Sequence, residues 1–111
     1  MVVEPDAQRA REDARAYAAT YLGLTNYTSN LLRFGFTEAD IDERSGDEAS
    51  GRGRCGSDRL IDAVIPHGSA EAIAEAVQAH FDAGADHVCL QPLGHGPAPV
   101  GDYRALAEAL L

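Results

Sequence analysis

The stretch FDAGADHVCLQPL, residues 81–93, decides the fold class of this chain. Gly84 predicts the end of a helix, because glycine adopts the left-handed backbone conformation without a steric penalty. Residues 87–91 are expected to form a short strand that Pro92 ends, since proline has no N–H for the ladder. The three apolar residues at 88–90 follow one another directly, which is typical of a strand covered on both faces. A parallel strand among helices is therefore the first prediction.

The rest of the sequence shows helical periodicity interrupted by glycine and proline. Val2-Val3 is expected to be a strand, and His67-Gly68 is expected to turn the chain. A short strand ending at Pro66 is an alternative to the end of the fourth helix, because the residues before it are β-branched. Apolar residues recurring every three or four positions predict helices at about 5–22, 24–34, 37–42, 58–65, 70–83 and 102–111.

Polar residues at helix starts locate several of these boundaries. Thr37 and Asp40 resemble a capping box, in which two side chains and two backbone N–H groups satisfy one another. Ser57 or Asp58 can cap the fourth helix, Ser69 is a good N-cap for the fifth, and Asp102 is expected to cap the last.

Apolar spacing predicts which helix faces are buried. The second and fifth helices each carry an apolar stripe, and the tyrosines are more simply interpreted as core than as site residues. The stripe residues are Leu24, Tyr27, Leu31 and Phe34 on the second helix and Ile73, Val77 and Phe81 on the fifth; the tyrosines are Tyr17, Tyr21 and Tyr27.

The composition restricts the class of protein. The chain has 111 residues and a formal net charge of −9, and all nine basic residues are Arg. This charge argues against nucleic-acid and anionic-membrane partners, which need a basic surface. No apolar run approaches the roughly 20 residues of a membrane span, and the N-terminus lacks a signal pattern, so a cytoplasmic protein is expected. Cys55 and Cys89 are expected to be a loop thiol and a core thiol rather than a disulfide.

The number of strands is too small for a complete α/β fold. Two parallel strands make a poor sheet with open edges, and the helices have too few partners for their apolar faces. The chain is therefore expected to be a single partial domain over 1–111 that either belongs to a larger α/β fold or completes itself by association. Its expected parts are a strand end plus helix (1–23), a helical insertion (24–66) with a polar loop (43–56), and a helix-strand-helix segment (67–111).

Three blocks together carry a resemblance to a known family. They are VVEPDAQRARE (2–12), YLGLTNYTSNLLRFGFTEADI (21–41) and GSDRLIDAVIPHGSAEAIAEAVQAHFDAGADHVCLQPL (56–93). In these blocks the chain resembles the C-terminal part of the bacterial-luciferase-like oxidoreductases, and within them the actinobacterial branch that uses the deazaflavin coenzyme F420. Each block alone would be weak, but together they cover nearly the whole sequence.

The resemblance implies a fold and an activity. The family fold is a (β/α)8 TIM barrel, of which this chain would be the C-terminal part, mostly helical with about two parallel strands. The implied activity is hydride transfer between coenzyme F420 and an organic substrate, with an FMN-dependent luciferase-like monooxygenase as the alternative. The family's catalytic residues come largely from early strands, so no catalytic residue is assigned, and the chain alone is expected to be inactive.

Barrel geometry implies where the site residues lie. Gln91 ends the last strand, and Gly94 and His95 lie in the loop after it, where late loops often bind phosphate; these three are the expected cofactor-binding residues. Asn26, Tyr27 and Asn30 belong to the insertion expected over the barrel mouth, and they are the expected substrate-pocket residues.

Other chemistries find less support in the sequence. The spacing of His67, His80, His87 and His95 matches no metal motif, so no metal site is predicted. His67-Gly68-Ser69 offers backbone N–H groups at a helix start, which is a weak indication of an anion site because every capped helix has this feature. A non-catalytic α/β module that forms a homodimer is the interpretation from a different class.

Overall fold

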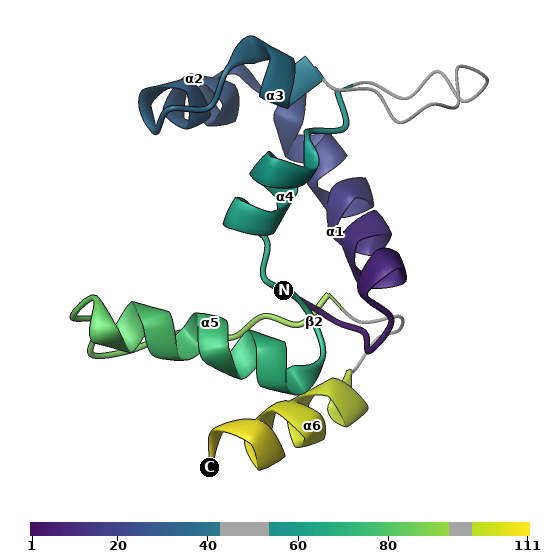
Figure 1. Cartoon of the computed structure of the whole chain (residues 1–111), viewed down its shortest axis with the longest axis vertical. Helices are drawn as coiled ribbons and strands as arrows, with labels where there is room; N and C mark the ends of the chain where they lie inside the picture. Colours follow the sequence, from purple (N-terminus) through teal and green to yellow (C-terminus); the bar gives the residue numbers. More distant parts are fainter. Residues whose placement is uncertain (43–53, 94–98) are drawn as a thin grey trace. The chain divides into compact units, whose positions relative to one another are not determined.

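The computed structural model describes residues 1–42, 54–93 and 99–111 (Figure 1). The described part is an α/β arrangement, mostly helical with one two-stranded parallel sheet, as the sequence predicts. Its elements are β1 (Val2–Val3), α1 (Ala7–Leu22), α2 (Thr25–Arg33), α3 (Glu38–Asp42), α4 (Asp58–Val64), β2 (His67–Gly68), α5 (Ala70–Asp82) and α6 (Val100–Leu110). They form two compact units: unit 1 is Met1–Ala10 with Pro66–Leu111, and unit 2 is Arg11–Ile65.

The sheet of unit 1 pairs β1 with β2. The strands are parallel, with Val2 opposite His67 and Val3 opposite Gly68. Two backbone hydrogen bonds extend the ladder, from the Val2 N–H to the Pro66 carbonyl at 3.0 Å and from the Glu4 N–H to the Gly68 carbonyl at 2.8 Å. His67-Gly68 is thus a strand, and its prediction as a turn is wrong, because only the pairing with the distant β1 makes these two residues a strand.

Residues 87–91 do not form the regular strand that the sequence predicts. The chain after α5 instead returns to the N-terminus, where the Met1 ammonium donates to the Gln91 carbonyl at 3.0 Å and the Leu93 N–H donates to the Met1 carbonyl at 2.8 Å. Two such bonds flanking one residue are the pattern of a parallel ladder, here placing Met1 opposite Pro92. We call residues 87–93 the third segment; it lies beside β1, so the order is β2, β1, third segment.

Side chains of the third segment alternate in burial. Val88 and Leu90 are half-buried and pack on the cluster formed by α5 and α6, and Pro92 is buried. The intervening residues His87, Cys89 and Gln91 are exposed; this alternation is that of extended chain. The prediction of a segment covered on both faces, with Cys89 as a core thiol, is therefore wrong, because Cys89 is exposed while its neighbours Val88 and Leu90 pack on the helical cluster.

The two other strands agree with this division into faces. Met1 and Val3 pack on the same helical cluster as Val88 and Leu90. At Gly68, which is paired with Val3, an added Cβ would lie 3.4 Å from the Ala72 Cβ in α5. The helix-facing side of the sheet is thus consistent across all three segments.

The core of unit 1 lies where α6 packs against α5 (Figure 1). Ile73 and Val77 from α5 and Leu106 from α6 are almost fully buried. Phe81, which continues the predicted stripe, is 42% exposed because the stripe runs past the end of the core. Gly84 has a φ of 98° and follows the last turn of α5, as predicted.

Unit 2 is built from the remainder of α1 and from α2, α3 and α4. Its buried apolar side chains are mostly small on α1 and branched on α3 and α4: Ala14, Ala18, Leu22, Ile41, Leu60 and Ile61. Gly56 lies among them, and an added Cβ there would lie 3.0 Å from Leu22 Cδ1 and 3.2 Å from Ile61 Cδ1. A Cβ at this position would therefore require the neighbouring side chains to shift by a few tenths of an ångström, and the positive φ of 76° also favours glycine.

The predicted apolar face of α2 is largely exposed. Phe34 is 80% exposed, Leu24 and Tyr27 are close to half exposed, and the residue of α2 that is buried is Thr28. Tyr17 is also exposed rather than core. Periodicity found this helix correctly but not its orientation, because a stripe of apolar residues does not say whether another element is there to cover it.

The capping predictions are confirmed with one exception. The Thr37 N–H donates to Asp40 Oδ2 at 2.8 Å, and the Asp40 N–H donates to Thr37 Oγ1 at 3.2 Å. Ser57 and Ser69 accept from the N–H groups of Leu60 and Ala72. Asp102 is wrong as the cap of the last helix, because α6 begins two residues earlier; the N-cap is Pro99 and the acidic residue falls in the first turn.

Three further findings bear on the sequence predictions. Residues 58–64 are helical, so the alternative strand before Pro66 is not formed. No disulfide joins Cys55 to Cys89. Within the described ranges, no helix is long and apolar enough to cross a membrane. Most of the predicted polar loop, residues 43–53, lies outside the described residues.

Candidate functional site

The end of the third segment is the first candidate site. Gln91 is positioned by its own carbonyl, which accepts from the Met1 ammonium, while its side chain is exposed. Burial of the ammonium among apolar groups lowers the pKa of the Met1 N-terminus. Gly94 and His95, the other predicted cofactor-binding residues, lie outside the described residues. The described part of this site is therefore one strand-end amide on the face opposite the helices.

Cys89 and His87 share that face, and the sequence prediction missed both as site residues. They precede Gln91 at intervals of two, and all three side chains are exposed. Positions 87, 89 and 91 are spaced by two, and in an extended strand residues with this spacing lie on the same face. This spacing was overlooked because three successive apolar residues suggested cover on both sides.

The N-terminus of α5 already has hydrogen-bond and charge partners within the chain. The Ser69 hydroxyl accepts from the Ala72 N–H at 3.3 Å. A hydrogen bond with Ser69 also lowers the pKa of Glu71, whose carboxylate lies in the first helical turn. The helix dipole is thus matched by the chain's own carboxylate, and a phosphate here would meet a like charge. This weighs against the anion site considered at His67-Gly68-Ser69.

The second candidate site is the exposed surface of α2. Asn26, Tyr27 and Asn30, the predicted substrate-pocket residues, are all exposed on this helix, and Asn26 and Asn30 are one helical turn apart. Neither amide side chain forms a hydrogen bond with any residue that the structure describes. The three residues are thus brought together on one helix surface, with free amide donors and acceptors.

Tyr27 belongs to a cluster of three tyrosine rings. Its ring centroid lies 4.9 Å from that of Tyr21 in an edge-to-face arrangement, and the Tyr17 and Tyr21 centroids are 5.1 Å apart. The Tyr17 and Tyr21 hydroxyls are 3.0 Å apart, and this hydrogen bond raises the pKa of Tyr17. Such ring pairs stabilise by about 0.5–1.5 kcal/mol beyond their burial. The cluster therefore fixes the orientation of Tyr27 beside the two asparagines.

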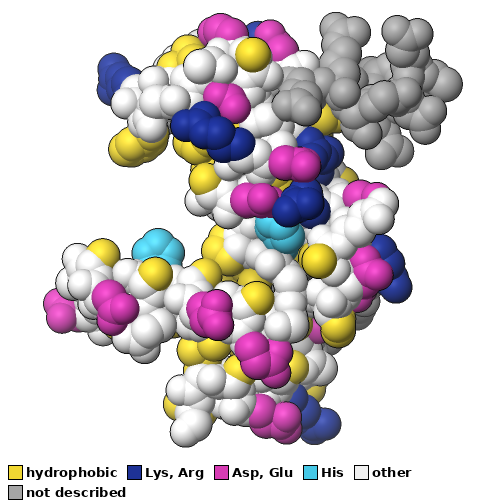
Figure 2. Space-filling model, in the orientation of Figure 1, with side chains coloured by type: hydrophobic (Ala, Val, Ile, Leu, Met, Phe, Trp, Pro, Cys, Tyr) yellow, Lys and Arg dark blue, Asp and Glu magenta, His cyan; other side chains and the backbone are white. Residues whose placement is uncertain are grey.

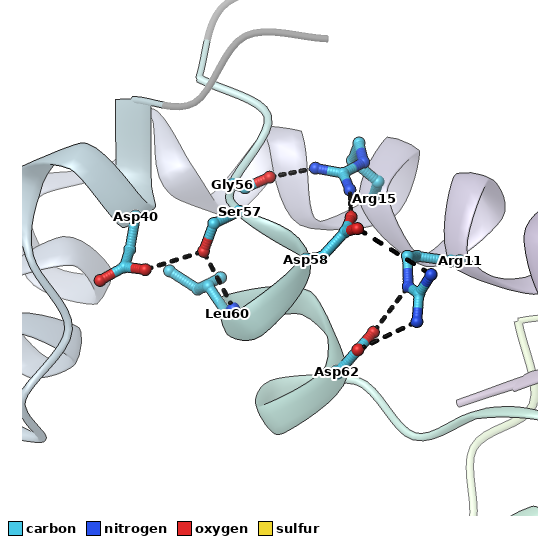
Figure 3. A network of polar contacts seen from close by, with 8 residues as sticks. All are labelled: Arg11, Arg15, Asp40, Gly56, Ser57, Asp58, Leu60 and Asp62. Atoms are coloured by element: carbon cyan, nitrogen blue, oxygen red, sulfur yellow. Dashed lines mark hydrogen bonds and ion pairs between the residues drawn. The ribbon is translucent and has the colours of Figure 1, made fainter.

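Unit 2 also contains a polar network that connects α1, α3 and α4 (Figure 3). Arg11 donates to both carboxylate oxygens of Asp62, at 2.8 and 3.0 Å. Arg15 pairs with Asp58 and donates to the Gly56 carbonyl. These contacts hold the start of α4 against α1. Since every charge in them has a partner, the network is a structural feature and not a candidate catalytic group.

Asp40 is the acidic centre of the other half of this network. Its carboxylate accepts from the Thr37 N–H and hydroxyl, from the Ser57 hydroxyl at 2.9 Å and from Arg59 at 2.9 Å. The Thr37 backbone and side-chain hydrogen bonds, followed by that of Ser57, lower the pKa of Asp40 from 3.8 to about 2. Arg59 also lies over the Phe36 ring, with Cζ 4.7 Å from its centroid. Asp40 thus joins α3 to the N-terminus of α4.

The charged side chains visible in Figure 2 are not gathered into one patch. On the face drawn in Figure 2, Asp and Glu side chains are dispersed among uncharged ones over both units. Among the residues that the structure describes, no group of three or more His, Cys, Asp or Glu side chains is arranged to hold a metal ion. The two candidate sites are therefore the uncovered face of the third segment and the surface of α2.

Comparisons of the chain with protein-family models, with curated proteins and with solved structures found no match.

Proposed function

We propose that this chain is the C-terminal segment of a luciferase-like oxidoreductase that transfers a hydride between coenzyme F420 and an organic substrate. The proposal rests on the three sequence blocks at 2–12, 21–41 and 56–93. The structural observation that supports it is the parallel pairing of β1 with β2, with α5 following β2 directly. A strand followed by a helix, with parallel pairing between the strands, is the repeating pattern of (β/α)8 barrels.

Within this proposal each candidate site has a role. Gln91, with Gly94 and His95, contributes to the rim of the coenzyme site at the carboxyl ends of the late strands. Asn26, Tyr27 and Asn30 contribute to the substrate pocket, where amides and a tyrosine hydroxyl fix the orientation of a small organic molecule. The coenzyme supplies the hydride chemistry; these side chains bind and orient. FMN in a luciferase-like monooxygenase is the alternative coenzyme, and the cytoplasm is the proposed location.

A second candidate is a non-catalytic α/β module that associates with a second copy. The order of the segments favours it: consecutive strands of a barrel are neighbours, which would put β2 between β1 and the third segment. Here β1 lies between them, because Met1 bonds to Gln91 and Leu93. The exposed apolar side chains of α2, above all Phe34, favour it too, since association would remove them from water.

The test is coenzyme binding by the chain, followed through the fluorescence anisotropy of the deazaflavin. We expect saturable binding, weaker competition by FMN, and no hydride transfer by the chain alone. Gln91→Ala should weaken binding, whereas Gln78→Ala, at an exposed position on α5, should leave it unchanged. Absence of saturable binding of either coenzyme by chain whose circular dichroism is that of a folded protein would contradict the proposal. Deazaflavin-dependent turnover by the chain alone would contradict its inactivity.

A further inference from the structure

The outer edge of the third segment has backbone groups without a partner in the described part of the chain. Its inner edge faces β1, where the Gln91 carbonyl and the Leu93 N–H are bonded to Met1. In an extended chain the N–H and carbonyl of successive residues point to opposite sides, so those of Val88 and Leu90 face outward. Within the ranges that the structure describes, no backbone hydrogen bond reaches these groups. They can therefore pair with a further strand.

This edge lacks the usual protection of an exposed strand. Proteins commonly protect such edges with charged side chains or with a proline inside the strand. From His87 to Gly101 the sequence has no Asp, Glu or Arg, although the formal net charge of the chain is −9. Pro92 stands beyond Val88 and Leu90, near the end of the segment. Two copies of this edge can therefore approach without bringing carboxylates together, which would be unfavourable.

A second copy of the chain fits this edge better than the chain's own remaining residues. Val88 and Leu90 pack on the helical cluster, so a strand added beside them needs apolar side chains at the same spacing. Residues 43–53 and 94–98 contain no Val, Ile, Leu, Phe or Tyr. A second third segment supplies the same two apolar side chains with the same alternation.

We propose that two copies of the chain pair through their third segments, antiparallel, around a twofold axis that passes between the two Cys89 residues. The twofold arrangement uses the same edge of each copy and closes after two chains. In this register Val88 lies opposite Leu90 of the second copy, and each such pair exchanges two N–H···O bonds. A register with Pro92 opposite Val88 or Leu90 loses a bond, because proline has no N–H. The inference rests on the second candidate function, the self-associating module, and needs no coenzyme.

The two Cys89 thiols make this register measurable. As a non-hydrogen-bonded pair their Cα atoms would lie about 4.5 Å apart, a separation that a disulfide can span. Diamide, which takes up the two thiol hydrogens as the disulfide forms, should link two chains through Cys89 and leave Cys55 unlinked, as read by mass spectrometry of the peptides. In a Cys89→Ser background, a thiol placed by Gln91→Cys is also at an exposed position, but it lies about 13 Å along the strands from its copy and should link far more slowly.

Sedimentation equilibrium measures the association itself. The natural chain should give a mass near twice 11.8 kDa. Cys89→Asp places two carboxylates opposite each other and should raise the dissociation constant of the dimer roughly fivefold or more, whereas the neutral Cys89→Asn, which has the shape of Asp, should change it little. Phe34→Ser tests the other exposed surface, at a position of α2 that is 80% exposed, and should change the constant less than Cys89→Asp does. Circular dichroism checks the fold of each variant.

The outcomes separate this contact from the module as a whole. A folded chain that stays monomeric at every concentration measured overturns both. A dimer that Phe34→Ser dissociates and Cys89→Asp does not would have its contact on α2, which overturns this inference and leaves the module standing. A dimer in which the thiol at position 91 links as fast as Cys89 overturns the register. A dimer that Cys89→Asp weakens and diamide links through Cys89 supports the inference, whether or not the chain binds a coenzyme.

Discussion

Units 1 and 2 are stabilised by different kinds of contact. Unit 2 has arginine–carboxylate and hydroxyl–carboxylate contacts between helices, centred on Asp40 and Asp58. Unit 1 depends on backbone pairing between short strands and on apolar packing of Ile73 and Leu106. The difference teaches where sequence is informative: capping and charge pairing around a helix start are local signals, whereas the pairing of two-residue strands is decided by partners far along the chain.

The largest expected effect is the loss of the apolar centre of unit 1. Leu106→Ala removes a side chain that is 1% exposed between α5 and α6. It should lower the free energy of unfolding by about 2–5 kcal/mol, because the lost methyl groups leave a cavity. Urea denaturation followed by circular dichroism measures it.

The matched control lies on the same helix. Tyr103→Ala removes a half-exposed side chain of α6 and should cost less than about 1 kcal/mol. Equal effects of the two substitutions would mean that α6 does not hold the core of unit 1 through Leu106.

The next expectation compares the two serine caps. Ser57→Ala should cost about 1–2 kcal/mol, because this hydroxyl both accepts from the Leu60 N–H and donates to Asp40. Ser69→Ala should cost nearer 1 kcal/mol, since Ser69 caps α5 without binding a second helix. Thermal unfolding of the two variants under one condition gives the comparison. A larger loss of stability for Ser69→Ala than for Ser57→Ala would contradict the conclusion that unit 2 depends more than unit 1 on polar contacts between helices.

Acid should also reveal the difference between the two units, because unit 2 contains the carboxylate of Asp40. The pKa of Asp40 is lowered from 3.8 to about 2, chiefly by the hydrogen bonds from Thr37. A carboxyl group whose pKa is lower in the folded than in the unfolded state stabilises the fold above the unfolded value, and this contribution is lost as the pH falls from about 3.8 to about 2. Urea midpoints across that window should fall more steeply for the natural chain than for Asp40→Asn. Parallel pH profiles would contradict the role of Asp40.

The features that could be predicted from the sequence are those that depend on local contacts, and the features that could not are those that depend on distant partners. The starts at Thr37, Ser57 and Ser69 were predictable because a cap needs only residues within one helical turn. The strand at His67-Gly68 was not, because its partner β1 lies far away in sequence. For the candidate site, the exposure of Gln91 followed from its place beyond an apolar run. The exposure of Cys89 did not, since the sequence does not say how many layers cover a strand.

The smallest expected effect is that of the exposed ion pair. Arg11→Met removes the bidentate contact with Asp62, in which both side chains are substantially exposed. The loss of stability should be the smallest of those compared and should shrink in high salt, because surface pairs are screened. A double-mutant cycle with Asp62→Asn measures the pair itself. A coupling energy that high salt leaves unchanged would contradict this treatment of the pair as a surface contact.

The most direct test of the account is the alignment of the third segment with β1, because it sets the face that carries Cys89 and Gln91. Nuclear magnetic resonance of the isotope-labelled chain measures it through amide exchange and through proton–proton contacts between strands. We predict a slowly exchanging Leu93 amide, and contacts that place Met1 opposite Pro92 and Val2 opposite His67. A Leu93 amide that exchanges at the rate of an unstructured chain, with no contact to Met1, would contradict the account.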